Sequence, residues 1–321
     1  NSRMTPAQKR HAWRWIARGE AQVVVGARSA LMLPYGNLGM IVIDEEHDTS
    51  YKQEESVIYH ARDMGVVKAS IMNVPIILAS ATPSLESLYN AKQGKYHLLS
   101  MDERYGLATF PQVNTVDLRE HKVGPTQGWI SPPLVSAIEK RLESGEQTLL
   151  YLNRRGFAPL TLCQGCGFRL KCPNCTAWLV QHKFHDRTLC HHCGYNRPLP
   201  SQCPGCKESN TWVPCGPGVE RIEEEVAKKF PRARALIMAS DQLDSHEKLD
   251  TALSQILNHQ VDIIIGTQMI AKGHHFPLLT LVGVLDADVG WSGGDLRACE
   301  KTCQLLHQVS GRCGRAERPG E

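Results

Sequence analysis

The sequence predicts an α/β protein made of two sheet-containing units, with a cysteine-rich module inserted in the second. Short apolar, β-branched runs alternate with helical patterns, and each run ends in a polar or glycine-containing turn. A stretch dense in Cys, Pro and Gly interrupts the second unit. Buried parallel strands read as continuous apolar runs, and their functional side chains follow the strand carboxyl ends. With 321 residues, of which 42% are hydrophobic, the chain can build two cores and a small module.

The first unit is predicted over residues 1–110. Thr5 followed by Pro6 is a favourable helix start, and Gly19 is expected to end that helix. Strands are expected at residues 22–25, 40–43 and 75–78, with a helix around residues 60–71. The turns after these strands are Gly26-Ala27-Arg28-Ser29, Asp44-Glu45-Glu46-His47 and Ser80-Ala81-Thr82-Pro83.

A linker is expected at residues 111–145, because its first part is rich in Pro, Gly and charge. The second unit follows as residues 146–158 and 215–321, and the inserted module occupies residues 159–214. The expected strands of this unit are residues 148–152, 234–238, 261–265 and 281–285, and its expected helices are residues 219–230, 245–257 and 298–309.

Four C-x-x-C pairs lie in the inserted module: Cys163/Cys166, Cys172/Cys175, Cys190/Cys193 and Cys203/Cys206. Two thiolates on one tight turn supply half of a tetrahedral Zn²⁺ shell, and a second turn completes it. The chain carries no secretory signal, which indicates a reducing, cytoplasmic setting where paired cysteines favour metal over disulfides. The module is therefore predicted to hold two structural zinc ions. The remaining four cysteines are expected to be ordinary thiols.

The spacing favours a nested pairing of these turns. Fourteen residues separate Cys175 from Cys190, enough for a hairpin that joins the two inner pairs, and the outer pairs would close around them. A sequential pairing, in which the first two turns share one ion, stays open. Positive φ angles are expected at the glycines of the turns, Gly165, Gly167, Gly194 and Gly205.

The module is basic although the whole chain, at +3, is nearly neutral. Its charged residues up to Lys207 are six cations, Arg169, Lys171, Lys183, Arg187, Arg197 and Lys207, against Asp186 alone. Trp178, Phe184 and Tyr195 are interleaved with them. Such a face suits a nucleic-acid strand, and it equally suits a solvated surface around a very small core. The apolar runs are too short to cross a bilayer, so no membrane partner is expected.

Two further motifs point to nucleotide chemistry. Asp44, Glu45, Glu46 and His47 follow an apolar run. In nucleotide hydrolases the acid at such a position holds Mg²⁺, and the next carboxylate polarises the attacking water. Gln308, Arg312 and Arg315 surround two glycines, and arginines of this kind stabilise charge on a transferring phosphoryl group. Alone, each motif is equally readable as surface charge.

Taken together, these motifs resemble those of superfamily 2 helicases. Residues 44–47 (DEEH), 80–84 (SATPS), 266–273 (GTQMIAKG) and 308–315 (QVSGRCGR) occur in that family's order. The sequence also resembles the primosomal protein N′ family of replication-restart helicases, over essentially the whole chain. The resemblance is carried by residues 153–157 (NRRGF), the four Cys pairs and residues 216–220 (GPGVE). The resemblance implies two RecA-like lobes, with the zinc module inserted in the second.

The resemblance also implies roles for single residues. Asp44 would be the Mg²⁺-linked acid and Glu45 the water-activating carboxylate, completed by Glu46 and His47. Gln308, Arg312 and Arg315 would face ATP. Residues 51–59 correspond to the family's aromatic-rich coupling loop, reduced here to two tyrosines. The remaining implied sites are Ser80, Ala81 and Thr82 for coupling hydrolysis to strand movement, and Arg28, Ser29, Thr267 and Gln268 for the DNA backbone.

By this resemblance the parent is an ATP-dependent 3′→5′ DNA helicase of replication restart. Its implied partners are forked or single-stranded DNA, primosome proteins and single-strand-binding proteins. No G-x-x-x-x-G-K-[ST] loop occurs in the sequence, and the family places that loop upstream. We therefore expect a fragment that hydrolyses little or no ATP by itself. Two alternatives stay open: a non-enzymatic zinc-ribbon scaffold for DNA or protein, and a duplex-specific translocase that does not separate strands.

Overall fold

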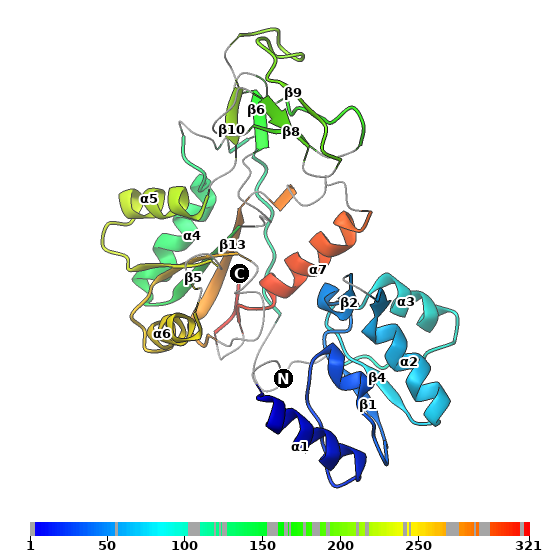
Figure 1. Ribbon diagram of the computed structural model, residues 1–321. Helices are drawn as coiled ribbons and strands as arrows, with labels where there is room; N and C mark the ends of the chain where they lie inside the picture. The colour runs from blue at the N-terminus through cyan, green and yellow to red at the C-terminus, as the bar shows by residue number, and fades with distance from the viewer. Residues whose placement is uncertain are drawn as a thin grey trace. The chain divides into compact units, whose positions relative to one another are not determined.

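The computed structural model divides into two compact units, Asn1–Leu99 and Ser100–Glu321, and each is described by itself. Figure 1 labels the elements. The structure describes residues 4–54, 57–101, 110–118, 120–121, 123, 127–152, 160–163, 166, 168–175, 178–181, 187–190, 193–209, 212–215, 218–239, 243, 245–267, 276–285, 287–288, 296–314 and 318–321.

Unit one begins with helix α1 (Pro6–Ala17). The Thr5 side chain accepts a hydrogen bond from the Gln8 amide, and the Gln8 side chain accepts one from the Thr5 amide. This capping box satisfies two amides at the helix start, where Pro6 needs no partner. After the C-cap Arg18, Gly19 takes a φ of +71° and turns the chain away. The predicted start and end of this helix are confirmed.

The sheet described in unit one has two parallel strands, β1 (Ile41–Ile43) and β4 (Ile76–Leu78). Ile43 lies opposite Leu78. The hydrogen-bond ladder continues past both strands, because the Ala79 amide donates to the Ile43 carbonyl (2.8 Å) and the Glu46 amide to the Ala79 carbonyl (3.1 Å). The residues that follow β1 are thereby fixed beside those that follow β4.

Short elements and two further helices complete unit one. These are the 3₁₀ turns η1 (Arg28–Met32) and η2 (Thr49–Tyr51), the antiparallel pair β2 (Lys52–Gln53) and β3 (Tyr59–His60), and the helices α2 (Ala61–Met72) and α3 (Leu85–Lys92). Helix α2 lies close against β1 at Gly65, where an added Cβ would approach the Ile43 Cδ1 to 2.8 Å. A glycine is needed there for this close packing.

The strand predicted at residues 22–25 is wrong. This segment is not part of any strand in the described chain, and Val23 and Val25 are 80% and 93% exposed. A β-branched run becomes a strand only where a neighbour completes its hydrogen bonds and covers its side chains. In the described residues no strand pairs with it.

Unit two is built on a four-stranded parallel sheet in the order β11-β12-β5-β13. The strands are β5 (Gln147–Leu152), β11 (Ala235–Met238), β12 (Ile263–Gly266) and β13 (Leu279–Leu285), close to the predicted ranges. All six residues of β5 are buried. A strand buried on both faces is what a continuous apolar run predicts.

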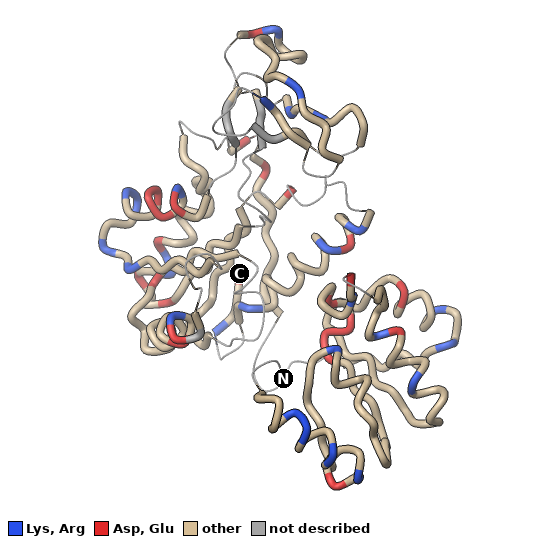
Figure 2. The backbone as a smooth tube through the Cα atoms, in the orientation of Figure 1, with Lys and Arg blue, Asp and Glu red and all other residues tan. Residues whose placement is uncertain are grey.

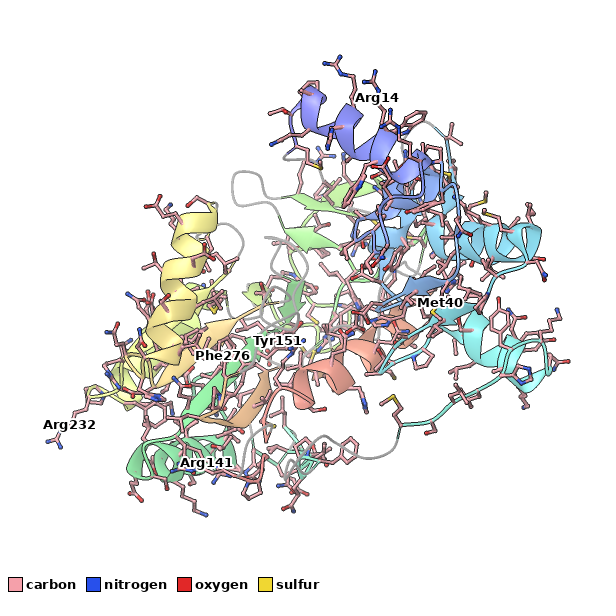
Figure 3. All side chains as sticks on the ribbon, turned by 90° about the horizontal axis from the view of Figure 1, so that it is seen from below. Arg14, Met40, Arg141, Tyr151, Arg232 and Phe276 are labelled. Carbon is pink, nitrogen blue, oxygen red and sulfur yellow. The ribbon has the colours of Figure 1, made fainter. Side chains whose placement is uncertain are left out.

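Helices cover both faces of this sheet. Leu150 and Leu152 of β5 face α4 (Pro132–Glu143) and α5 (Val219–Lys229) in one core. Leu149 and Tyr151 face α6 (His246–Leu257) and α7 (Ala298–Ser310) in another core. Figure 3 labels Tyr151 together with Phe276 of the same core. The alternation of neighbouring residues between two cores follows from the pleat of the strand.

Helix α4 corrects part of the predicted linker. It lies inside residues 111–145, and its Ile138 is fully buried in the core of unit two. The two prolines at its start suited a helix N-terminus as well as a linker. The end of this range therefore belongs to the packed unit.

The inserted module has its own five-stranded sheet, in the order β10-β6-β7-β8-β9. Its strands are β6 (Leu160–Cys163), β7 (Val180–Gln181), β8 (Arg187–Leu189), β9 (Asn196–Pro198) and β10 (Trp212–Cys215). The first and last strands pair antiparallel, with Leu160 opposite Cys215. An insertion whose two ends lie side by side leaves the host sheet intact, since β5 and β12 still pair.

The predicted fold class is confirmed: the chain is α/β, with parallel sheets flanked by helices and a cysteine-rich zinc-type module in its later part. Among the described helices, none combines the length and the apolar character that a bilayer crossing requires.

Ile138→Ala tests the placement of α4. Removing a side chain that is 0% exposed should lower the free energy of unfolding of unit two by about 2–5 kcal/mol, because a cavity remains. Urea denaturation followed by circular dichroism measures it. The matched control, Leu257→Ala at a 49% exposed position of α6, should cost no more than about 0.5 kcal/mol. Equal costs for both variants would contradict the buried position of α4.

Candidate functional site

The eight cysteines of the C-x-x-C pairs gather in two groups of four. The groups are Cys163, Cys166, Cys203 and Cys206, and Cys172, Cys175, Cys190 and Cys193, and within each all sulfur atoms lie within 4.8 Å of one another. This is the nested arrangement. The sulfur–sulfur distances between turns are 3.5 Å for Cys163–Cys206, 3.6 Å for Cys166–Cys203, 3.5 Å for Cys172–Cys193 and 3.5 Å for Cys175–Cys190.

These distances fit zinc. Zn–S bonds of about 2.3 Å in a tetrahedron place the sulfurs about 3.8 Å apart. Four thiolates this close would repel one another strongly, and a divalent cation removes that repulsion. Each group is all-cysteine, which is the donor set of a closed structural site with no open position for substrate. Both cysteine groups therefore fit zinc as a structural ion.

The turns of the zinc groups are shaped by backbone hydrogen bonds. The Gly194 amide donates to the Cys190 carbonyl, and the Lys207 amide to the Cys203 carbonyl, each at 2.9 Å. Gly194 and Lys207 each follow the second cysteine of a pair and take φ angles of +76° and +65°. A lysine therefore occupies the left-handed position that Gly194 occupies in the other group.

The expectation of a positive φ at Gly205 is wrong, and this glycine serves close packing. A Cβ there would lie 3.1 Å from Phe168 Cδ2 and 3.3 Å from the Cys166 sulfur. Gly205 therefore lets one turn approach the other. Gly165 and Gly167 lie outside the described residues.

The acidic residues predicted from the sequence lie at the carboxyl end of β1, beside the end of β4. His47 Nδ1 and Ser80 Oγ are 2.7 Å apart, and His47 Nε2 is 3.5 Å from Thr82 Oγ1. The Thr82 amide donates to Ser80 Oγ at 2.9 Å. Ala81, between them, is exposed. The structure thus joins the acidic segment to the Ser80–Thr82 segment through the imidazole.

Asp44 and Glu45 are exposed, whereas Glu46 is buried. Glu45 has a φ of +49°, which is uncommon for a residue other than glycine. Backbone strain of this kind is often found at functional sites. Its amide donates to Asp44 Oδ1 at 3.0 Å, and its carboxylate lies 3.6 Å from His47 Nδ1. Tyr51 donates its hydroxyl to the Asp44 carbonyl at 2.7 Å. The turn therefore presents two carboxylates outward on a tightly bonded backbone.

Glu46 is the anchor of this turn. Its carboxylate accepts from the Ser84 amide (2.6 Å), from the hydroxyls of Ser84 and Ser87 (3.0 Å each) and from Arg62 Nη1 (3.0 Å). Burial raises the pKa of the Glu46 carboxyl, but the bonds from Ser84, Arg62 and Ser87 outweigh burial and hold the pKa below its usual value. A carboxylate satisfied on this many sides positions the turn and does not face a ligand.

Sequence reasoning missed Arg62, Ser84 and Ser87. Arg62 is 5% exposed and lies on α2, and Ser84 is the N-cap of α3. The Pro-Ser-Leu-Glu-Ser pattern at residues 83–87 carries the signal of an N-cap, which could have marked Ser84. Nothing in the linear sequence pairs Arg62 with Glu46.

The residues predicted to contact DNA or the phosphoryl group lie on several elements of the two units. Arg28 Nη1 donates to the Lys52 carbonyl at 2.6 Å, and Ser29 is exposed beside it on η1. In unit two, Thr267 follows β12 and its amide donates to the Met238 carbonyl at 3.4 Å. Gln308 lies on α7, and Arg312 follows that helix and is 9% exposed. Gln268 and Arg315 lie outside the described residues.

Comparison with known protein families gives two matches. Residues 1–91 match the DEAD/DEAH box helicase family, and residues 172–198 match the PriA DNA helicase Cys-rich region domain. The first match includes the acidic turn and Ser80–Thr82. The second includes all four cysteines of the inner zinc group.

Curated relatives are similar over the whole chain. The chain is 48% identical to the replication restart protein PriA of Rickettsia prowazekii over 320 residues, which is 100% of this chain and 49% of that protein. It is 43% identical to the PriA of Bacillus subtilis, covering 100% of this chain and 40% of that protein. The chain thus spans about half the length of the curated relatives it matches. Among solved structures, RecG bound to a three-way DNA junction is 14% identical, with a TM-score of 0.43 over 98% of this chain and 30% of that chain.

Zinc content separates the two cysteine groups. The purified chain should carry about two zinc ions by elemental analysis, one for each group. Cys172→Ser should remove about one ion, and adding Cys203→Ser should remove nearly all zinc, because each group needs four thiolates. Cys303→Ser, an exposed thiol outside both groups, is the control and should leave the zinc content unchanged. One ion or fewer in the unsubstituted chain would contradict two sites.

Glu46→Gln tests the anchor of the acidic turn. At neutral pH it should destabilise unit one by about 1–3 kcal/mol, because buried Arg62 loses one carboxylate partner and keeps Asp63 at 2.8 Å. Since the folded-state pKa of Glu46 is depressed, its stabilisation is complete above the unfolded-state pKa of about 4.3 and is lost as pH falls through the folded-state value.

Thermal unfolding between neutral and acid pH measures this effect. The unsubstituted chain should lose more stability on acidification than Glu46→Gln does. Glu86→Gln, whose carboxylate is 4.0 Å from Arg62 and 39% exposed, should change stability by no more than about 1 kcal/mol. The same acid dependence in the unsubstituted chain and in Glu46→Gln would contradict the role given to Glu46.

Proposed function

We propose, from the chain's membership of the PriA family of superfamily 2 helicases, that its parent protein is an ATP-dependent 3′→5′ DNA helicase that acts in restart of stalled replication forks. The chain supplies the acidic turn, the arginine motif and the zinc module of that enzyme. Because it spans about half of its relatives, activity belongs to the complete protein.

One observation carries the proposal: the carboxylates after β1 and the hydroxyls after β4 are joined through His47, with 2.7 Å between His47 Nδ1 and Ser80 Oγ. A helicase must link hydrolysis at one place to movement of a strand at another. Neighbouring ends of two parallel strands give the shortest physical link between the two.

Asp44 and Glu45 can supply the carboxylate oxygens that ATP hydrolysis needs around Mg²⁺ and the attacking water. Both side chains are exposed, and carboxylates are the donors that Mg²⁺ takes. When bound, Mg·ATP supplies the γ-phosphoryl group. Asp44 would hold the ion through its carboxylate, and Glu45 would accept the proton of the attacking water. Glu46 and its bonds to Ser84 keep this turn in place.

The remaining roles follow from the family motifs. Gln308, Arg312 and Arg315 stabilise charge that develops on the phosphoryl group. Arg28, Ser29, Thr267 and Gln268 contact the DNA backbone. Ser80, Ala81 and Thr82 transmit the state of the nucleotide. Forked or single-stranded DNA is the substrate, and primosome and single-strand-binding proteins are the protein partners.

Glu45→Gln in the complete protein tests the proposal, since this sequence contains no G-x-x-x-x-G-K-[ST] loop. The variant should lose unwinding and DNA-stimulated ATP hydrolysis by about 100-fold or more, because it cannot accept a proton, while DNA affinity stays unchanged. Strand-displacement and ATPase assays measure both. Glu20→Gln, at an exposed carboxylate 3.8 Å from Arg18, is the control and should keep full activity. Unwinding that survives Glu45→Gln would contradict the role given to Glu45, and a complete protein that binds DNA without unwinding it would favour the non-enzymatic scaffold.

A further inference from the structure

Cations, aromatic rings, Leu170 and Pro204 line a pocket of about 610 Å³ on the zinc module, and no carboxylate is among its described lining residues. Its charged and aromatic lining residues are Phe168, Arg169, Lys171, Trp178 and Arg197. Figure 2 shows lysines and arginines recurring along the described parts of the module. Because none of these residues ligates zinc, the structural role of the module does not explain the pocket.

The two zinc groups fix the walls of the pocket. Residues 168–171 join the outer cysteine group to the inner one. The Cys163 amide donates to the Phe168 carbonyl (2.9 Å), the Leu179 amide donates to the Leu170 carbonyl (2.8 Å), and Lys171 pairs antiparallel with Trp178. Side chains on a backbone held at both ends by metal are already ordered before a ligand arrives, which lowers the cost of binding.

Positive charge is concentrated around the Trp178 ring. The Arg169 guanidinium carbon lies 5.9 Å and the Lys171 ammonium 5.4 Å from its centroid. Arg169, Lys171 and Arg197 share the described lining of the pocket with no carboxylate, and none of them belongs to a cysteine group. Three cations at one cavity favour an anionic ligand.

Two buried donors point to the same ligand. Trp178 Nε1 and Arg197 Nε are buried, and neither has a hydrogen-bond partner among the described residues. An unbonded buried N–H group costs free energy, and an acceptor recovers that cost once the side chain turns the group toward it. A phosphate group offers several acceptor oxygens together with the negative charge that the cations require.

Phe168 adds a contact that a phosphate alone would not use. Its ring rests on Gly205, and the side chain is still 38% exposed. An exposed ring beside phosphate-binding cations is the arrangement with which proteins hold single strands, since unpaired bases stack on the ring. An acidic peptide would leave this ring without a matching group.

We propose that this pocket binds single-stranded DNA, with backbone phosphate held by Lys171, Arg197 and Arg169 and one base stacked on Phe168. This inference rests on the proposed helicase function and adds a contact between the zinc module and a DNA strand.

Binding of a fluorescent oligo(dT) to the zinc-loaded chain, measured by anisotropy across a salt series, tests the site. Lys171→Gln with Arg197→Gln should weaken binding about tenfold or more. It should also reduce the slope of log K against log salt by about 1.4, because each phosphate contact on a single strand contributes about 0.7. Phe168→Ala should weaken binding about fivefold or more through lost stacking, with the salt slope unchanged.

The control is Arg187→Gln, a cation of the same module whose guanidinium bonds to Asn196 at 2.6 Å outside the pocket lining. It should bind DNA like the unsubstituted chain. Each variant is compared at equal zinc content. If Arg197→Gln loses zinc, the single variant Lys171→Gln, at an exposed side chain, decides, with an expected slope change of about 0.7.

The outcomes separate the pocket from the wider proposal. If the unsubstituted chain binds oligo(dT) and the pocket variants bind equally well, the pocket is wrong and the helicase proposal stands. If the unsubstituted chain binds no single strand, the DNA contact proposed for this chain fails with it. If poly-glutamate binds in place of DNA and loses affinity in the same variants, the site is for acidic protein, and the inference is overturned.

Discussion

Parallel pairing of neighbouring strands is the constraint on which the candidate site depends. In unit one, β1 and β4 run in the same direction, so their carboxyl ends meet at one edge and carry the acidic turn and Ser80 side by side. The hydrogen bonds of Ala79 and Glu46 extend the ladder beyond both strands. Antiparallel pairing would place these two segments at opposite ends of the sheet.

The zinc module depends on a different constraint, which is the metal-binding geometry of its cysteines. Its described apolar cluster has four buried residues, Leu170, Cys172, Leu179 and Cys190, and is too small to order the segment by apolar burial alone. Two ions contribute about 10 kcal/mol or more each in structural sites of this kind. Because β6 pairs with β10, the module is closed at its base while β5 keeps its place in the parallel sheet.

Sequence patterns predicted features that depend on local spacing. The cysteine turns, the start of α1 at Thr5-Pro6 and the fully buried β5 are of this kind. The strand predicted at residues 22–25 is wrong because a strand needs a neighbouring strand, and local composition does not reveal whether one is present. Arg62 was missed because its partner Glu46 is sixteen residues away on another element. The orphaned donors of Trp178 and Arg197 depend on tertiary packing and have no linear signature.

We propose that His47 and Ser80 act as one unit that links ATP hydrolysis to strand movement. A double-mutant cycle with His47→Ala and Ser80→Ala in the complete protein tests it, with base pairs unwound per ATP hydrolysed as the measured quantity. We expect each single variant to lower this ratio and the double variant to lower it little further, a coupling of about 1 kcal/mol or more. Additive effects of the two substitutions would contradict the coupling of His47 with Ser80.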